Sequence, residues 1–246
     1  MAKYKVFACE VLFREVCAEA AVTQNVIDLT FVRYGLHHVG CEKMVAELQS
    51  HVDAVEPGKY EAILLIYGLC NNGIVGLKSR STPLVLPKAH DCITLLLGSK
   101  ERYNTEFGRE PGTYYLSPGW LEHLNVDEQE SLYCNLGLNM PYEKMVELYG
   151  EENAKYLLET MGSLGTHKET YTRIAYIDTG FGPKEDLIAQ SRARAEQNGW
   201  RLDLLQGDRA LIRKMLDGEW SPDDFVVVRS EQAVKPTYDG AVIKAE

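Results

Sequence analysis

The sequence has no long apolar run, and this absence bears on where the protein acts. No stretch reaches the roughly 18 apolar residues of a membrane-spanning helix. The first residues, 1–16, carry a charge every few positions and so lack the apolar core of a secretory signal peptide. We therefore expect a cytoplasmic protein that does not cross a membrane.

Clustered positive charge is missing as well. The 246 residues include 26 Lys and Arg against 36 Asp and Glu, which gives a formal net charge of −10. Proteins bind nucleic acid chiefly through clusters of Lys and Arg that contact phosphates, so we expect no nucleic-acid partner. The sequence also has no Walker A loop, Rossmann glycine fingerprint, Gly-x-Ser-x-Gly elbow or His-Glu-x-x-His helix.

Cysteine is scarce for a chain of this length. Six cysteines in 246 residues are too few for a disulfide scaffold, and the cytoplasm is a reducing compartment. We therefore interpret the cysteines as free thiols or metal ligands. A free cysteine often behaves as a small buried apolar residue, and we adopt that interpretation for Cys17, Cys41 and Cys134.

Segments with strand composition alternate with segments of helical period along the chain. We expect strands at 4–8, 26–34, 62–67, 84–86, 113–116, 173–177, 202–205 and 225–228, and helices at 10–22, 41–55, 184–198 and 209–216. Strands that alternate with helices form right-handed crossovers in a mostly parallel sheet. The sequence therefore predicts one Rossmann-like α/β domain of residues 1–246, with helices on both faces of the sheet and a helical insertion at about 121–170.

Three cysteines follow three different predicted strands. Cys9 ends the run VFAC, Cys70 ends LIYGLC, and Cys92 follows LVLPKAHD. In α/β sheets the carboxyl ends of parallel strands form the edge that binds ligands, so residues far apart in sequence meet there. At the first turn of a helix, unpaired N–H groups also lower the pKa of a cysteine and favour its thiolate. We expect the three thiols to form a functional site at this edge.

The residues at this edge point to a metal centre. His90 precedes Cys92 by two positions, and a His-x-Cys pair with a remote cysteine makes a three-ligand zinc site that keeps one position open. Our first choice is zinc bound by Cys70, Cys92 and either Cys9 or His90. The three thiolates are equally suited to a 4Fe–4S cluster that leaves one iron free for substrate.

Five further residues are candidates for binding the substrate: Asn71, Asn72, Asp91, Tyr115 and Trp120. The two asparagines follow the second cysteine and carry amide donors. The aspartate stands beside the third cysteine, where a carboxylate orients a ligand. The two aromatic residues belong to the segment 110–120, whose turn residues and aromatics are typical of a loop that packs over a cleft and excludes water.

Three classes of function remain open on the residues alone. The first is a metal-dependent enzyme that transfers a group to or from a small-molecule substrate. The second is a non-catalytic protein that binds and delivers a metal or a cluster or, as a family resemblance implies, a corrinoid. The third is a metal-free thiol enzyme, in which one cysteine of low pKa attacks and His90 acts as the base. The sequence fixes neither the substrate nor the oligomeric state, and a homo-oligomer is among the states that it allows.

The cysteine junctions and the aromatic segment resemble those of a known family. Ala8-Cys9, Tyr67-Gly-Leu-Cys70, the run 90–99, the segment 114–120 and the turns at 207–208 and 218–220 are similar to the DUF1638 family of bacterial and archaeal proteins, a family of unknown function. The resemblance implies a role in methyl transfer near one-carbon metabolism, with a corrinoid protein as partner. Corrinoid-linked methyltransferases commonly use a zinc ion bound by His-x-Cys and another cysteine, and residues 90–92 match that short pattern.

Overall fold

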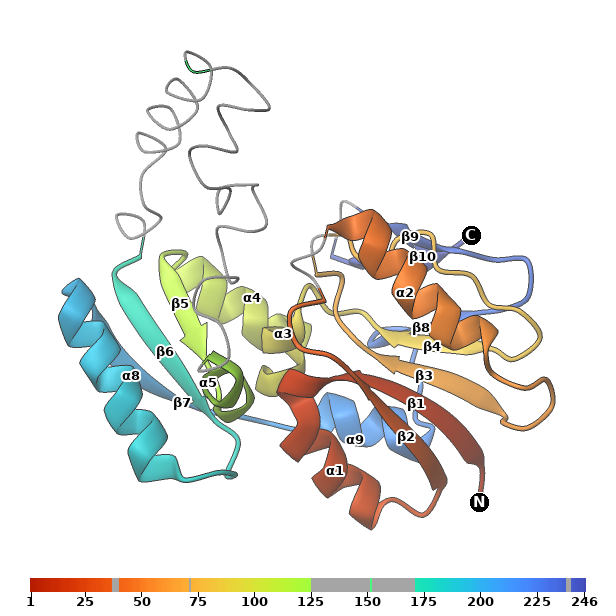
Figure 1. Ribbon diagram of the computed structural model, residues 1–246, viewed down its shortest axis with the longest axis horizontal. Coiled ribbons are helices and arrows are strands. Elements are labelled where there is room, and N and C mark those ends of the chain that lie inside the picture. Colours follow the sequence, from red (N-terminus) through yellow and green to blue (C-terminus); the bar gives the residue numbers. More distant parts are fainter. Residues whose placement is uncertain (37–39, 71, 125–150, 152–170, 238–239) are drawn as a thin grey trace.

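The strands of the chain divide between two separate sheets and a short hairpin (Figure 1). The computed structural model describes residues 1–36, 40–70, 72–124, 151, 171–237 and 240–246. In this part of the chain, five strands form a sheet in the order β2-β1-β3-β4-β8, and three form a second sheet in the order β5-β6-β7. We call the first sheet, with its helices and the β9–β10 hairpin, the first lobe, and the second sheet with its helices the second lobe.

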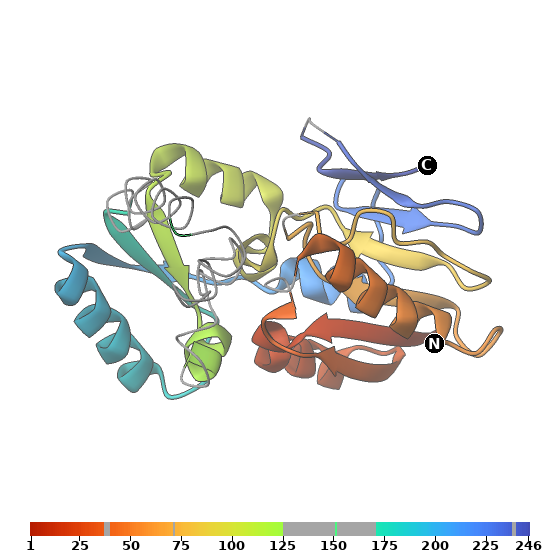
Figure 2. The ribbon, with the colours of Figure 1, turned by 45° about the horizontal axis from the view of Figure 1, so that its top comes forward.

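The first lobe holds both ends of the chain, as Figure 2 shows. Its elements are β1 (Lys3–Cys9), the short 3-10 helix η1 (Glu10–Leu12), α1 (Phe13–Val22), β2 (Val26–Val32), α2 (Cys41–Asp53), β3 (Ala62–Ile66), β4 (Leu84–Pro87), α3 (Cys92–Leu97), α9 (Ala210–Asp217), β8 (Phe225–Val228), β9 (Val234–Pro236) and β10 (Ile243–Ala245). Strands β1 to β4 run parallel, and β8 joins β4 antiparallel. Helices α1 and α9 cover one face of this sheet and α2 covers the other (Figure 1).

Burial explains the order of the first sheet. Every residue of β3 is buried, which is the pattern of a central strand covered on both faces. Strand β2 lies at the edge and is only partly buried. Helix α2 buries Met44, Leu48 and Val52, which recur every four residues and so form one apolar stripe. The stripe packs on the sheet, where the rings of His51 and Phe7 lie 5.3 Å apart.

The second lobe consists of three parallel strands and three helices among the described residues. They are α4 (Lys100–Arg109), β5 (Thr113–Leu116), α5 (Pro118–Leu124), β6 (Arg173–Asp178), α8 (Lys184–Asn198) and β7 (Arg201–Gln206). On one face of the sheet, Ile174 and Tyr176 pack with residues of α5 and α8. Successive side chains of a strand point to opposite faces, and the alternate residues Tyr115, Ala175 and Ile177 belong to the core of the first lobe. The two lobes therefore share one continuous core.

Polar contacts also join the lobes. Arg14 of α1 forms an ion pair with Glu122 of α5, with 2.7 Å between nitrogen and oxygen. The Thr179 hydroxyl donates to the buried carboxyl of Glu15 at 2.5 Å, and Arg209 donates to the Thr179 carbonyl at 2.9 Å. These contacts fix the carboxyl end of β6 against α1 and α9.

The predicted α/β character is confirmed, with a mostly parallel first sheet and helices on its two faces. Helix α8 has the predicted limits, and it ends at Gly199, whose φ of 68° suits glycine. The expectation of a single sheet is wrong, because the strands form two sheets and a hairpin, whereas the antiparallel β8 is consistent with a mostly parallel sheet. The predicted insertion at 121–170 lies outside the described residues except for 121–124 and 151. Within the described residues, no helix is long and apolar enough to cross a membrane.

Candidate functional site

The ends of three neighbouring strands meet at one edge of the first sheet. Strands β1, β3 and β4 are parallel and adjacent in that order, as predicted, so their carboxyl ends lie side by side. Cys9 is the last residue of β1, Cys70 lies in the turn after β3, and Cys92 is the first residue of α3, shortly after β4. The topology therefore brings these three cysteines, separated by more than eighty residues of chain, to the same edge.

Cys9 is the last residue of β1, and Tyr67 directly follows the neighbouring strand β3. The register between the two strands ends with Ala8 opposite Ile66, and the Tyr67 N–H then donates to the Leu65 carbonyl at 3.0 Å. Cys9 is 8% exposed and Tyr67 is 3% exposed. The Tyr67 hydroxyl lies next to the Cys9 sulfur as a hydrogen-bonding neighbour, without the alignment of a complete hydrogen bond. Burial raises the pKa of Cys9 to about 11.

Cys70 lies in a tight turn that is held against the β4–α3 junction. Its φ of 43° is in the left-handed region, which residues other than glycine adopt at an energetic cost. The Cys70 N–H donates to the carbonyl of His90 at 2.9 Å. Gly68 is required before it, because a Cβ there would lie 2.4 Å from the Cα of Asp91. These contacts hold Cys70 beside the turn that leads into Cys92.

Asp91 caps the helix that begins with Cys92. Its Oδ1 accepts hydrogen bonds from the N–H groups of Ile93 at 3.0 Å and Thr94 at 3.3 Å, as an N-cap residue does. The Tyr103 hydroxyl donates to Oδ2 at 3.4 Å. Burial raises the pKa of Asp91, although these hydrogen bonds oppose the rise. Each carboxylate oxygen thus has a protein partner, and Asp91 fixes the first turn of α3 with Cys92 in it.

The three thiols affect one another's ionisation. Burial is the main cause that raises the pKa of Cys70 and the pKa of Cys92, and the charges of Asp91 and of the other thiols raise both further. Cys9 contributes to both shifts, so the three sulfurs lie within electrostatic reach of one another. The lowered pKa expected at a helix N-terminus is therefore wrong for Cys92. Helix α3 has only six residues, and burial outweighs its dipole.

Two aromatic residues reach this edge from the second lobe. The predicted loop is in fact β5 and the start of α5. The first turn of α5 packs closely on η1, since a Cβ at Gly119 would lie 1.9 Å from the carbonyl oxygen of Val11. This approach brings the Trp120 indole next to the Cys92 sulfur. Tyr115 is 7% exposed and close enough to Asp91 for that charge to raise its pKa, after burial as the main cause. The site therefore contains residues of both lobes.

The other predicted residues lie outside this group. His90 is exposed, and its ring stacks on Tyr103 with 5.6 Å between the centroids. Asn72 is also exposed, with a φ of 67°, and it lines a groove on the α2 side of the turn. Asn71 lies outside the described residues. The predicted site residues that the structure gathers at the edge are Cys9, Cys70, Cys92, Asp91, Tyr115 and Trp120.

Buried hydrogen-bond donors without a complete hydrogen bond surround the thiols. They are the hydroxyls of Tyr67 and Tyr115 and the indole N–H of Trp120. A buried polar group that lacks a partner costs about 1–3 kcal/mol, so these donors suit a site whose bound group supplies acceptors. Within the described ranges, no three His, Cys, Asp or Glu side chains are already arranged around one point as a metal ion requires. Binding one ion therefore requires the cysteine side chains to rotate toward it.

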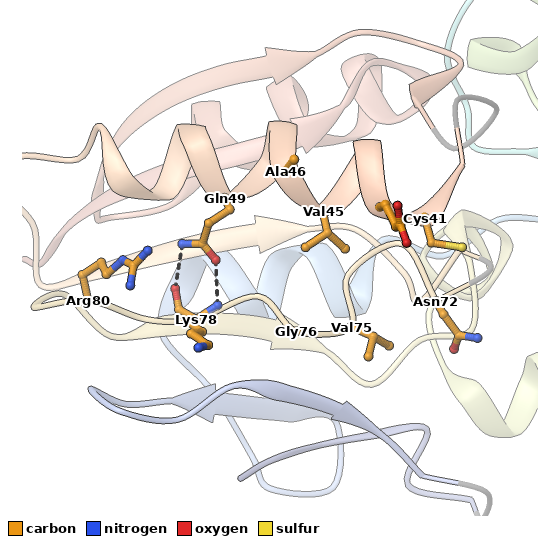
Figure 3. Close-up of a pocket in the computed structure, with 10 residues that line it drawn as sticks. Cys41, Val45, Ala46, Gln49, Asn72, Val75, Gly76, Lys78 and Arg80 are labelled. Atoms are coloured by element: carbon orange, nitrogen blue, oxygen red, sulfur yellow. Dashed lines mark hydrogen bonds between the residues drawn. The ribbon is translucent and has the colours of Figure 1, made fainter.

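The groove beside α2, drawn in Figure 3, is lined by none of the three thiols. It has a volume of about 640 Å³, is open to solvent, and lies between α2 and the turn that follows β3. Gln49 joins its two walls by accepting a hydrogen bond from the Lys78 N–H at 2.9 Å and donating to the Lys78 carbonyl at 3.1 Å. Arg80 at the same wall pairs with Asp53 at 2.7 Å. Asn72 is the residue that brings this groove nearest to the cysteine turn.

Sequence reasoning missed three side chains around the thiols. The Tyr67 hydroxyl lies near the Cys9 sulfur. Glu10 accepts a hydrogen bond from the Tyr34 N–H at 2.6 Å, and its charge raises the pKa of Cys9, in addition to burial as the main cause. Burial raises the pKa of Tyr34, and the charges of neighbours that include Cys9 and Cys92 raise it further. Glu10 follows a predicted strand, and Tyr34 and Tyr67 are the last residues of predicted strands, so the rule that selected the cysteines also selects these residues.

Comparison with known proteins finds one family model. The model described as "Protein of unknown function (DUF1638)" matches residues 31–216, which is more than half of the chain. No curated protein and no solved structure matches the chain.

Proposed function

The chain belongs to the DUF1638 family, and we propose that this member binds a metal centre through Cys9, Cys70 and Cys92 at the carboxyl edge of its first sheet. The observation that carries the proposal is the meeting of three thiols from three neighbouring strand ends, within electrostatic reach of one another. The centre is a zinc ion or an iron–sulfur cluster, since both favour thiolate ligands.

The electrostatics of the edge support a bound cation. Burial and the nearby carboxylate of Asp91 raise the pKa values of Cys70 and Cys92, so in the absence of a cation both thiols are neutral. A bound metal ion reverses this balance, because its charge deprotonates a coordinating thiol outright. A metal-free thiol enzyme instead requires a cysteine of lowered pKa. The raised pKa values thus count against the metal-free thiol enzyme.

Three protein ligands define the chemistry that the centre supplies. Zinc with three protein ligands keeps one position for water or substrate, and a cluster with three thiolates leaves one iron available. His90 remains our predicted alternative to Cys9 as the third ligand, and its ring must leave its stacking contact with Tyr103 to serve in that way. Tyr115 and Trp120 cover the edge from the second lobe, where they exclude water from the open position.

Narrower statements about this protein remain predictions. Methyl transfer to or from a small molecule, with a corrinoid protein as partner, rests on the family resemblance, and non-catalytic delivery of a metal uses the same three ligands. A cytoplasmic location, a homo-oligomeric state, the Rossmann-like character of the first sheet and the helical insertion at about 121–170 also remain predictions.

Metal and sulfide analysis of protein purified without oxygen tests the proposal. We expect about one zinc ion per chain and no colour, or about four irons with sulfide and a brown colour. Replacement of Cys9, Cys70 or Cys92 by serine is expected to remove most of the metal, because each change takes away an anionic ligand.

Matched controls come from the cysteines outside the site. Cys17 in α1 is partly exposed and Cys41 at the start of α2 is exposed, whereas Cys134 lies outside the described residues. Serine at any of these three positions is expected to leave the metal content unchanged. A native protein without stoichiometric metal, or metal loss that is equal in control and site variants, contradicts the proposal.

A further inference from the structure

We infer that β2 is an interface strand, which pairs antiparallel with β2 of a second copy of this chain and so joins the first sheets of the two copies. The inference goes beyond the proposed function, because it assigns a partner surface and does not depend on the metal centre. It is carried by the backbone groups, the side chains and the charges of β2.

The outer side of β2 carries backbone groups that no strand of the described residues uses. Strand β2 is the last strand of the first sheet and pairs only with β1. The Val26 N–H donates at 2.8 Å to the carbonyl of Ala2, just before β1. Because backbone groups point alternately to the two sides of a strand, the N–H and C=O groups of Ile27, Leu29 and Phe31 point away from β1. An edge of this kind is a template for pairing with another chain.

Strand β2 lacks the features by which proteins usually protect a free edge. Its seven residues contain no proline, lysine or arginine, and its register with β1 runs without a bulge. Its one charge, Asp28, pairs with Lys5 of β1 at 2.8 Å. By contrast, the free edge strand of the second sheet, β7, carries the ion pair of Arg201 and Asp203. The unprotected edge of β2 therefore indicates a partner strand.

A two-fold axis through Leu29 makes the apolar side chains of β2 complementary to one another. Ile27 then lies opposite Phe31 of the second copy, and Leu29 lies opposite its counterpart. All three outward-pointing residues thus form pairs that exchange two hydrogen bonds each. Their side chains share the face on which the half-exposed ring of Phe13 lies 4.9 Å from the ring of Phe31. Apolar and aromatic pairs directly opposite each other stabilise antiparallel strands.

The charges on the other face select a second copy as the partner. The same axis places Asp28 opposite Thr30 of the second copy, where a hydroxyl can donate to the carboxylate. No two like charges then lie opposite each other along the paired strands, an arrangement that would be destabilising. Within one chain, Lys5 donates to Asp28 at 2.8 Å and to Thr30 at 2.7 Å, so the carboxylate is balanced before the copies meet. Strand β2 is therefore complementary to itself in hydrogen bonds, apolar contacts and charge.

Sedimentation equilibrium of the purified full-length chain, over a series of concentrations, measures the association. Thr30→Asp tests the register, because the new carboxylate can still accept from Lys5 within one chain but faces Asp28 across the axis. Adding Asp28→Asn to Thr30→Asp removes this repulsion. Phe13→Lys replaces an apolar contact at the interface from outside the sheet. Leu204→Asp is the control, because it adds a carboxylate at an exposed position of the other free edge strand, β7.

We expect the wild type to have twice the 27.7 kDa mass of one chain. The dissociation constant of Thr30→Asp and of Phe13→Lys should rise by at least about 10-fold, the double variant should recover most of this loss, and Leu204→Asp should match the wild type. A wild type that stays monomeric at every concentration overturns the inference and leaves the edge to an extended segment of another protein. A dimer that Thr30→Asp and Phe13→Lys leave unchanged uses another surface, which also overturns it. Neither result bears on the metal centre.

Discussion

Replacement of Gly119 by alanine tests how closely the second lobe packs on the cysteine edge. The new Cβ would lie 1.9 Å from the carbonyl oxygen and 2.7 Å from the carbonyl carbon of Val11, where ordinary contact begins at 3.4 Å. Both atoms belong to the backbone of η1, so no side chain can rotate to relieve the overlap. Helix α5 must therefore move away from η1, and Trp120 must move with it.

The cost of this movement follows from the packing. An extra methyl group in a well-packed contact typically destabilises a protein by about 1–3 kcal/mol, and a backbone obstacle places Gly119→Ala near the upper end. For a chain of this length, each kcal/mol lowers the melting temperature by about 2–4 °C. We therefore expect Gly119→Ala to melt about 6–12 °C below the wild type. Under the proposed function its metal content should also fall, because Trp120 moves away from Cys92.

Gly108→Ala is the matched control in the same lobe. Gly108 lies in α4, where a Cβ would meet nothing within 4 Å. Alanine is favoured over glycine inside a helix by about 1 kcal/mol, so this variant should be as stable as the wild type or more stable. Thermal unfolding followed by circular dichroism measures both variants. A Gly119→Ala protein that melts with the wild type would refute the close contact between α5 and η1.

Two further predictions concern buried charge. Arg173 is fully buried against three carboxylates, so Arg173→Met should lower the free energy of urea unfolding by about 3 kcal/mol. Arg201→Met, at a half-exposed position, should lower it clearly less. Equal losses would contradict this assignment. Burial tends to raise the pKa of Glu19, but the ion pairs with Arg213 and Arg209 outweigh burial and lower this pKa. The ionised Glu19 therefore stabilises the folded protein at neutral pH, and this stabilisation is lost as the pH falls below the unfolded pKa of 4.5. Glu19→Gln should therefore be less stable than the wild type by about 1–3 kcal/mol at pH 7, and this difference in stability should shrink toward about pH 3. A difference that does not change with pH would count against the ion pairs.

Hydrophobic pattern alone predicted most elements of the chain. The run AILLI of β3 is buried at every position, and helix α8 ends at Gly199 because glycine readily adopts the left-handed conformation that stops a helix. The edge that collects the cysteines was also predictable, since parallel strands present their carboxyl ends together. These features depend on local sequence and on one general rule of topology.

The division into two sheets depends on information that the strand sequences do not contain. An apolar strand must be covered on both faces, but its composition does not specify which strand lies beside it. Strand β6 is as buried as β3, yet it pairs with β5 and β7 rather than with the first sheet. The antiparallel direction of β8 could not be predicted either, because an antiparallel strand in a covered sheet has the same apolar composition as a parallel one.

The site was only partly predictable for a related reason. Cys9, Cys70 and Cys92 follow strands of one sheet, and their order in the sequence gives their order at the edge. Trp120 comes from the other lobe, and its position depends on the close contact between Gly119 and the backbone of η1. No sequence motif predicts this contact. Burial then reversed the expected direction of the Cys92 pKa, because six residues of helix do not offset the loss of water around the thiol.

The path of the chain links the site to the junction of the lobes. The chain leaves the first lobe after α3, which begins with Cys92, and it returns after β7, where the Asp208 N–H donates to the carbonyl of Leu96 at 2.8 Å. At the same point, a Cβ at Gly98 would lie 2.6 Å from the Cβ of Asp208, so the outgoing and returning segments touch just past the end of α3. At the other end of α3, Trp120 of the second lobe lies next to Cys92. Both ends of this short helix therefore lie at the junction of the lobes.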